Sequence, residues 1–403
     1  MKARKMSMKD ISNAHFARWP IFEDDEIEAV RDILISGKVN YWTGEEGRAF
    51  EREYAKSVNR KHGVALANGT LALELALTTL DLQPGDEVIV PSRTFIATAS
   101  AVVARGGVPT FADVDLNSQN ITADTIRAAI TPRTKGVIIV HLAGWPCDMD
   151  PILTLAMEHG LFIVEDCAQA HGATYKGRPV GSFGDAAAFS FCQDKIISTG
   201  GEGGLLVLDS EELWKKAWAY KDHGKSYDAV FNREHPLGFR WLHESFGSNW
   251  RMTEMQAAIG RIQLSKLPRW IASRRRNAAK LNDLLKDTPG IRLVIPPADI
   301  EHAYYRYYAF LETEQLAPGW TQMRVLEAIG SHGIPCSIGS CGEIYREQAF
   351  IRSELTPLDR RPIAKELART SLAFLIHPTL SDAELTKTAE VVHEVMIQAT
   401  ASR

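Results

Sequence analysis

The sequence has no long apolar run and no excess of charge of one sign. Its 403 residues include 46 Lys and Arg against 50 Asp and Glu, a formal net charge of −4. This balance gives no indication of a nucleic-acid-binding surface. No segment approaches the ~18 continuous apolar residues of a membrane span, and no apolar stretch follows the basic N-terminal residues. We therefore expect a cytoplasmic protein without a nucleic-acid partner or membrane association.

Cysteines and glycine-rich cofactor motifs are also sparse. The five cysteines form no CxxC pair and show no zinc-type spacing, so we expect no metal site. Their odd number predicts reduced and mostly buried thiols. No GxGxxG turn joins a predicted strand to a helix with an acidic residue about 20 positions later, which argues against a nicotinamide oxidoreductase. The cysteines are Cys147, Cys167, Cys192, Cys336 and Cys341.

Short apolar runs alternate with segments of helical periodicity. The runs are rich in Val and Ile, as strands covered on both faces are. This alternation predicts an α/β fold with a mostly parallel central sheet and helices on both faces. The expected strands are 63–67, 87–91, 108–114, 135–142, 161–166, 186–191 and 203–208. The expected helices between them are 71–80, 98–106, 123–130 and 150–160.

The length allows two or three domains at about 150 residues each. A helix at 24–37, stopped by Gly37, is expected to pack against the body of the protein. A long helical stretch that begins near Met252 is interrupted at Pro268, which suits a connection between two bodies. We predict an N-terminal arm and helix (1–36), a large cofactor-binding domain (37–265) and a smaller C-terminal α+β domain (266–403).

Polar residues stand where two of the predicted strands end, which is where open parallel sheets bind ligands. In ANGTLALELA, Gly69 permits a tight turn and Thr70 opens a helix, whose N–H groups and dipole suit a phosphate. Thr70 could equally be an ordinary helix N-cap with no ligand. At the end of 161–166, Glu165 and Asp166 must point to opposite faces of the sheet. A carboxylate buried there needs a partner, either an arginine, a helix N-terminus or a cationic cofactor ring.

A single lysine follows the strand at 186–191, in FSFCQDKIISTGGEGG. Lys195 could be a solvated loop lysine, but a desolvated lysine loses its proton more readily and attacks carbonyl groups. The glycines after it would let the backbone approach a ligand or a partner chain closely. An amine, an acid and a phosphate pocket are together what pyridoxal phosphate (PLP) needs for its aldehyde, its pyridine nitrogen and its phosphate.

The chain resembles the fold-type I PLP enzymes and, within them, the DegT-type nucleotide-sugar aminotransferases. The resemblance runs from about Gly37 to Ser381 and rests on a set of motifs in a fixed order. It implies a fold-type I transferase with a smaller C-terminal domain. The motifs are YWTGEEGRAFE, LANGTLALELAL, PSRTFIATASA, ITPRTKGVIIVHLAGWPCDMD, VEDCAQAHGATYKG, GSFGDAAAFSFCQDKIISTGGEGG, SNWRMTEMQAAIG and HPTLSD.

The resemblance implies catalytic roles for two residues. Lys195 matches the lysine that bonds the cofactor aldehyde, and Asp166 matches the carboxylate that pairs with the pyridinium nitrogen. Gln169 matches the glutamine beside the phenolic oxygen of the ring, and Phe95 the aromatic residue that stacks on it. Phe95 could equally be ordinary core, and Gln169 could satisfy backbone groups.

Further positions match contacts to the cofactor phosphate. Gly69, Thr70 and Ser190 match those of the same chain, and Asn249 matches the asparagine that reaches the cofactor of a neighbouring subunit. A site shared in this way implies a homodimer. Ser190 could instead satisfy a backbone group, and Asn249 could cap the helix that begins near Met252.

The family relationship implies transfer of an amino group from an amino acid, glutamate in the family, to a keto-sugar carried on a nucleotide, in amino-deoxy-sugar biosynthesis. Three alternatives remain. A keto-cyclitol could replace the sugar. A PLP-dependent sugar dehydratase has a histidine where this chain has Lys195, which argues against that activity. A non-catalytic regulator would be expected to carry a helix-turn-helix or basic patch, and neither is evident.

The sequence departs from the family in one region near the substrate. Many members have a proline-leucine-histidine motif there, whereas this chain has IPCSIGSCGEIYREQAF (334–350) without a histidine. Substrate contacts therefore cannot be transferred to this segment. Gly339, Ser340, Glu343 and Tyr345 are candidates for contacts with the sugar, although a structural loop would explain them equally well.

Overall fold

The computed structural model describes residues 16–401. Its largest element is a seven-stranded sheet in which six strands run parallel and only β9 runs the opposite way. The predicted α/β fold with a mostly parallel sheet is thus confirmed. In spatial order the strands are β1 (His62–Leu66), β9 (Gly204–Leu208), β8 (Ala186–Ser190), β5 (Phe162–Asp166), β4 (Thr134–Val140), β2 (Glu87–Pro91) and β3 (Val108–Ala112).

Helices cover both faces of this sheet, and alternate residues of each strand pack against one face or the other. In β8, for example, Ala186 and Ala188 face one helical layer while Ala187 and Phe189 face the other. The first layer contains α4 (Gly69–Thr79), α5 (Ala97–Ala104) and α8 (Glu211–Lys221). The second contains α3 (Glu46–Ser57), α6 (Ala123–Arg127), α7 (Met149–His159) and the first part of α10 (Glu254–Leu285).

A four-stranded antiparallel sheet forms the core of the C-terminal region. Its apolar residues pack against the second part of α10 and against two later helices. The strands are β10 (Ile291–Arg292), β12 (Tyr307–Leu311), β14 (Ser371–Phe374) and β13 (Cys336–Ser337), and the helices are α11 (Gln322–Ser331) and α14 (Asp382–Thr400).

Several short elements connect these parts. A small sheet joins β11 (Ile300–Glu301) to β6 (Thr174–Tyr175) and β7 (Arg178–Pro179). The remaining helices are α2 (Asp24–Ser36), α9 (Tyr227–Phe231), α12 (Gln348–Arg352) and α13 (Pro362–Thr370), and the 3₁₀ turns are η1 (Leu142–Gly144), η2 (Thr313–Gln315) and η3 (Ile344–Arg346).

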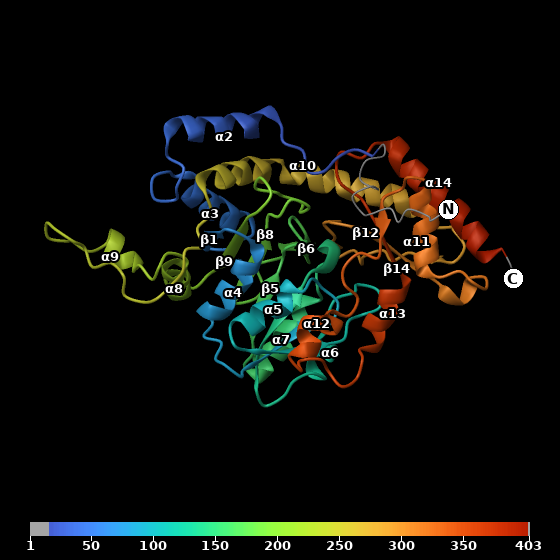
Figure 1. Cartoon of the computed structure of the whole chain (residues 1–403), viewed down its shortest axis with the longest axis horizontal. Helices are drawn as coiled ribbons and strands as arrows, with labels where there is room; N and C mark the ends of the chain where they lie inside the picture. The colour runs from blue at the N-terminus through green and yellow to red at the C-terminus, as the bar shows by residue number, and fades with distance from the viewer. Residues whose placement is uncertain (1–15, 402–403) are drawn as a thin grey trace.

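Helix α10 differs from the prediction, because it continues through Pro268 without a break. A proline inside a helix removes one hydrogen bond and crowds the preceding turn, at a cost of about 3 kcal/mol. Burial on both sides of the proline offsets this cost: Ala257 and Trp270 are buried beside the large sheet, and Leu281 is buried in the C-terminal core. In Figure 1, α10 spans the molecule from the large sheet to α14. The proposed boundary at residue 265 therefore lies within one continuous helix.

The N-terminal helix agrees with the sequence prediction. Helix α2 ends at Ser36, and Gly37 follows with a left-handed φ of 68°. It lies along α10 (Figure 1), where Lys266 forms ion pairs with Glu23, Asp25 and Glu26. No helix between residues 16 and 401 is both long and apolar enough to cross a membrane.

Candidate active site

A cavity of about 1660 Å³ lies between the ends of the large-sheet strands and the C-terminal region. The segment 16–22 and residues of β12 and β14 also line it. All the predicted site residues except Asn249 meet in this cavity, although they come from five separate parts of the sequence. They are Gly69, Thr70, Phe95, Asp166, Gln169, Ser190 and Lys195.

The N-terminus of α4 forms one wall of the cavity. Asn68, and not Thr70, is the N-cap, because its Oδ1 accepts a hydrogen bond from the N–H of Leu71 at 3.0 Å. Gly69 and Thr70 are consequently the first helical residues, and their N–H groups have no carbonyl partner within the helix. A Cβ on Gly69 would lie 2.6 Å from the Cβ of Ser190, so only glycine lets the helix approach this serine. These N–H groups and the Ser190 side chain form a cradle suited to an anion.

Asp166 lies at the end of β5 and faces the cavity with only 6% of its surface exposed. The hydroxyl of Thr98 donates to its Oδ2 at 2.9 Å, and the N–H of Ala168 donates to its Oδ1 at 3.2 Å. Burial raises the pKa of Asp166, although these hydrogen bonds and the charge of Lys195 act in the opposite direction. An ionised Asp166 therefore still needs a positive partner.

Glu165 points to the other face of the sheet, as the alternation of side chains along a strand requires. It is fully buried and accepts hydrogen bonds from the N–H groups of Gly181, Phe183 and Gly184 at 2.7–2.8 Å. His141 lies 3.1 Å from its carboxylate. Burial raises the pKa of Glu165, but His141, the backbone N–H groups and Arg60 outweigh it and lower the pKa overall. Glu165 is thus a structural carboxylate, and Asp166 is the one that faces the cavity.

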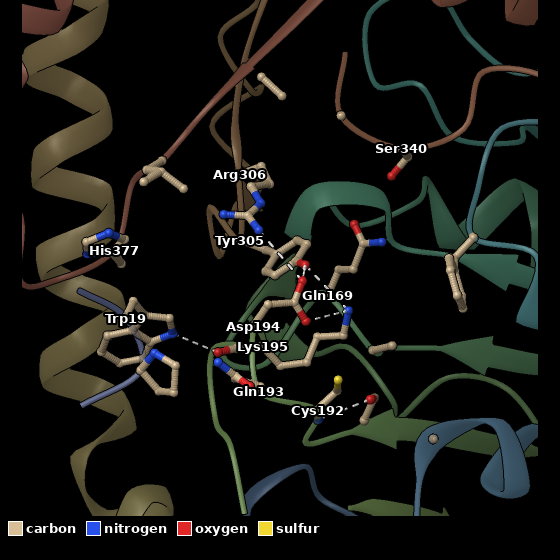
Figure 2. Close-up of a pocket in the computed structure, with 18 of the residues that line it drawn as sticks. Trp19, Gln169, Cys192, Gln193, Asp194, Lys195, Tyr305, Arg306, Ser340 and His377 are labelled. Atoms are coloured by element: carbon tan, nitrogen blue, oxygen red, sulfur yellow. Dashed lines mark hydrogen bonds and ion pairs between the residues drawn. The ribbon is translucent and has the colours of Figure 1, made fainter. Parts of the chain in front are cut away.

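Lys195 lies in the loop between β8 and β9 and reaches the cavity with its amine. Its Nζ is 3.4 Å from a carboxylate oxygen of Asp194 and 3.5 Å from the hydroxyl of Tyr305 (Figure 2). Burial lowers the pKa of Lys195, but Tyr305 and Asp194 outweigh burial and raise it overall. Desolvation favours the neutral amine, as expected, but Tyr305 and the acidic neighbour Asp194 outweigh it in this structure.

The chain is similar to known proteins in sequence and in fold. A family model described as the DegT/DnrJ/EryC1/StrS aminotransferase family matches residues 20–395. The chain belongs to this aminotransferase family. A solved aminotransferase from Psychrobacter cryohalolentis shares 50% sequence identity and a TM-score of 0.93, over 96% of this chain and 100% of that one. The predicted family and fold are confirmed, and the protein is an enzyme.

Curated relatives of the present chain match almost its whole length. The UDP-N-acetyl-3-dehydro-alpha-D-glucosamine 3-aminotransferase of Acidithiobacillus ferrooxidans is 37% identical over 95% of this chain and 96% of its own. The spore coat polysaccharide biosynthesis protein SpsC of Bacillus subtilis is 36% identical over 94% of this chain and 96% of its own.

Two more predicted residues of the aminotransferase border the same space. The side-chain oxygen of Gln169 accepts a hydrogen bond from the N–H of Ala143 at 2.7 Å, which leaves its amide nitrogen as the donor. Phe95 lines the cavity with 66% of its surface exposed, so it is not a core residue. Both placements are compatible with the ring contacts that the family resemblance implies.

Asn249 lies apart from this chain's own cavity. It is exposed and forms an isolated bridge with Asp222, so it does not cap α10, whose N-cap is Thr253. This location leaves Asn249 available to another chain, and its role stays a prediction.

Of the four glycines after Lys195, Gly200 and Gly201 line the cavity, as expected for a close approach to a ligand, whereas Gly203 and Gly204 differ from the expectation. A Cβ on Gly204 would overlap the carbonyl oxygen of Asn68, and one on Gly203 would overlap the side chain of Thr199. The close approach made possible by these two glycines is therefore to this chain's own backbone and side chains. Gly204 thus lets the start of β9 lie against the N-terminus of α4.

The sequence reasoning missed the residues that surround Lys195. The indole N–H of Trp19 donates to the backbone oxygen of Lys195 at 2.9 Å, and its ring stacks on His377. Tyr305 and Arg306 enter from the start of β12, more than 100 residues away in sequence. Only Asp194 could have been noticed, because it directly precedes Lys195.

The segment 334–350 makes two different contributions. Gly339 and Ser340 line the cavity, as candidate substrate contacts should. Glu343 and Tyr345 do not line it: they hydrogen-bond to each other, and Glu343 forms an ion pair with Arg360. These two candidates are therefore structural.

Proposed function

We propose that this enzyme is a PLP-dependent aminotransferase that moves an amino group from an amino acid to a keto-sugar carried on a nucleotide. Glutamate is the proposed donor, on the basis of the family resemblance, and amino-deoxy-sugar biosynthesis is the proposed role. The main support is one cavity that contains an amine, a buried carboxylate and a helix N-terminus: Lys195, Asp166 and Gly69–Thr70. The relative that acts on a UDP-linked 3-dehydro sugar supports a nucleotide sugar as acceptor.

The residues present fit PLP. Gly69, where a side chain would clash with Ser190, keeps the cradle at the start of α4 open for a phosphate. Asp166 lacks the positive partner that its burial calls for, and a protonated ring nitrogen would supply it. Lys195 provides the amine, and Phe95 provides an exposed aromatic face. PLP, when bound, supplies an electron sink for the bond that is broken at the donor's α-carbon.

The chain's own residues would handle the proton. Lys195, held beside Asp194 and Tyr305, would be placed to take a proton from the donor's α-carbon and to deliver it to the carbon that carries the cofactor's aldehyde. Asp166 keeps a proton on the ring nitrogen, because its buried carboxylate is stabilised only opposite a positive charge. Gln169 donates from its amide nitrogen toward the ring's oxygen substituent.

We also propose that the active enzyme is a homodimer. The segment 231–246 projects from the body at one end of the molecule (Figure 1) and carries a group of exposed apolar side chains. Monomeric proteins rarely expose such a group without a partner. A second copy that covers this segment would also bring Asn249 toward a neighbouring cavity. The exposed side chains are Phe231, Leu237, Phe239, Trp241 and Phe246.

The direct test is an amino-transfer assay with glutamate and a panel of keto-sugar nucleotides, in which the amino-sugar product is detected by mass spectrometry. We expect product with at least one of them and none with Lys195→Ala. Lys176→Ala, which removes a lysine paired with Asp150 outside the cavity, should keep its activity. Equal turnover of the same keto-sugar without its nucleotide, or of a keto-cyclitol, would contradict the proposed substrate class. An active Lys195→Ala would contradict the mechanism.

A further inference from the structure

Among the charged side chains that line the cavity are three cations and one carboxylate, and the Lys195 amine is one of the cations. The cations are Lys195, Arg274 and Arg306, and the carboxylate is Asp194. Arg18, Glu202 and the buried Asp166 also line the cavity, so its charged side chains are four cations and three carboxylates, an excess of one positive charge. Arg274 is buried, whereas 30% of the Arg306 side chain and 48% of the Asp194 side chain is exposed, so the cost of an unneutralised charge falls mainly on Arg274.

Arg274, on α10, contributes the charge that is hardest to explain. Only 1% of its surface is exposed, although it lines the cavity. Its guanidinium donates one hydrogen bond, to the backbone oxygen of Tyr304 at 3.1 Å, and its Nε has no partner among residues 16–401. Within those residues no carboxylate lies within 4 Å of it. Burial and the nearby charge of Arg306 lower the pKa of Arg274 to about 9.

Asp194 lies between the other two cations. One of its carboxylate oxygens is 3.4 Å from Nζ of Lys195, and the other is 3.6 Å from the guanidinium of Arg306. Figure 2 shows this carboxylate between the two cationic side chains, with the hydroxyl of Tyr305 directed at it. A carboxylate can therefore contact Arg306 while it lies next to the reacting amine.

We propose that Arg306, supported by Arg274, binds the carboxylates of a dicarboxylic amino-acid donor, and that Asp194 is a resident counter-ion that the donor displaces. This inference rests on the proposed transamination and assigns its donor subsite. In an α-amino acid the carboxylate and the amine are bonded to the same carbon, so a donor that reaches Lys195 brings its carboxylate to the position of Asp194. The diphosphate of a nucleotide sugar fits less well, because the sugar ring separates it from the reacting carbonyl.

The binding test uses the PLP-loaded protein and glutarate, a dicarboxylate without an amine, in isothermal titration calorimetry. Loss of a charge-assisted hydrogen bond should raise the Kd for glutarate at least about tenfold in Arg306→Gln. Arg306→Lys should recover part of the affinity, and Asp194→Asn should bind glutarate more tightly than the wild type. Arg276→Gln, an exposed arginine on the same helix as Arg274, is the matched control and should match the wild type.

Inorganic diphosphate is the second probe, because it represents the diphosphate group of the nucleotide sugar, which is the alternative anion. Its affinity should change less than twofold in Arg306→Gln. In steady-state assays the same variant should raise the KM for glutamate and leave the KM for the keto-sugar nucleotide within about twofold. Wild-type affinity for glutarate in Arg306→Gln, or loss of diphosphate binding instead, would overturn the assignment. Weaker glutarate binding in Asp194→Asn would contradict the proposal that the donor displaces the Asp194 carboxylate.

Failure of the inference and failure of the proposed function give different results. If amino transfer proceeds while Arg306→Gln keeps its glutamate KM and its glutarate Kd, the carboxylate subsite is wrong and the function stands. If glutarate binds through Arg306 but no amino acid supports transfer to any keto-sugar nucleotide, the subsite stands and the function is wrong.

Discussion

At the scale of single residues, Glu165 and Asp166 show how one strand separates a structural carboxylate from a functional one. Glu165 has three backbone donors, His141 and Arg60 around it, and its pKa is lowered. Asp166 has two donors and a raised pKa. The protein therefore stabilises an ionised Glu165 by itself, whereas an ionised Asp166 depends on a cationic ligand.

These two residues should respond oppositely to amide substitution in the cofactor-free protein. Glu165→Gln turns an amide N–H₂ toward backbone donors, and it should lower the free energy of unfolding at pH 7 by about 3 kcal/mol. Asp166→Asn should not lower it, because the variant no longer has an ionised, partly unpaired carboxylate. Urea unfolding checks both values, with Glu158→Gln at an exposed position as control.

The pH dependence follows from the directions of the pKa shifts. Because the pKa of Glu165 is lowered in the folded protein, its contribution is present above the ordinary glutamate pKa of about 4.3 and is lost as the pH falls through the folded value. The difference between wild type and Glu165→Gln should therefore shrink below about pH 4. A difference that stays constant from pH 7 to pH 3.5 would contradict the assigned role.

At the scale of secondary-structure elements, the site depends on the contact between the start of α4 and the end of β8. Gly69 allows this contact, and the loop that carries Lys195 leaves from the same strand. A change at Gly69 would therefore disturb the phosphate cradle and the placement of the amine together.

Gly69→Ala should weaken PLP binding, because the added methyl group would push Ser190 away from the cradle. We expect the PLP dissociation constant to rise at least about tenfold and the stability to fall by about 1–3 kcal/mol. Loss of visible cofactor absorption during dialysis measures the first effect. Gly330→Ala is the control: nothing lies within 4 Å of its added Cβ in α11, so it should gain about 1 kcal/mol of stability. Equal cofactor retention in both variants would argue against the cradle.

At the scale of the whole molecule, the proposed dimer assigns Lys195 and Asn249 of one active site to different chains. Separately purified Lys195→Ala and Asn249→Ala proteins should both be impaired. After unfolding and refolding together they should recover about a quarter of wild-type activity, because half of a random mixture is hybrid and each hybrid has one intact site.

A matched mixture provides the control for this experiment. Lys195 and Asp166 line the same chain's cavity, so Lys195→Ala mixed with Asp166→Asn should recover no activity. Recovery in both mixtures, or in neither while Asn249→Ala alone is impaired, would contradict a site shared through Asn249.

Local patterns predicted most of the large sheet. The run 87–91 is β2 to the residue, and 161–166 differs from β5 by one position, because continuous apolar runs are typical of buried parallel strands. Pro268 misled the prediction of α10, because burial on both sides of it outweighs its local penalty. Such compensation is a tertiary effect that a local pattern does not contain.

The candidate site was predictable only in part. Lys195 and Asp166 could be identified because Asp166 ends one strand of the large sheet, Lys195 follows another, and these strand ends meet at one edge. Trp19 contacts the backbone of Lys195 from the N-terminal segment, Tyr305 contacts its amine from just before β12, and Arg274 enters the same cavity from α10. Their approach depends on how the C-terminal region packs against the large sheet, which no periodicity in the sequence specifies.

The central claim is that Lys195 is the amine that holds the cofactor aldehyde. The most direct measurement is borohydride reduction of the PLP-loaded enzyme, followed by proteolysis and mass spectrometry of the peptides. The account predicts one pyridoxyl adduct per chain, on Lys195 in the peptide that contains FSFCQDKIISTGGEGG. An adduct on a different lysine, or an unmodified Lys195 in an enzyme that still transfers amino groups, would contradict it.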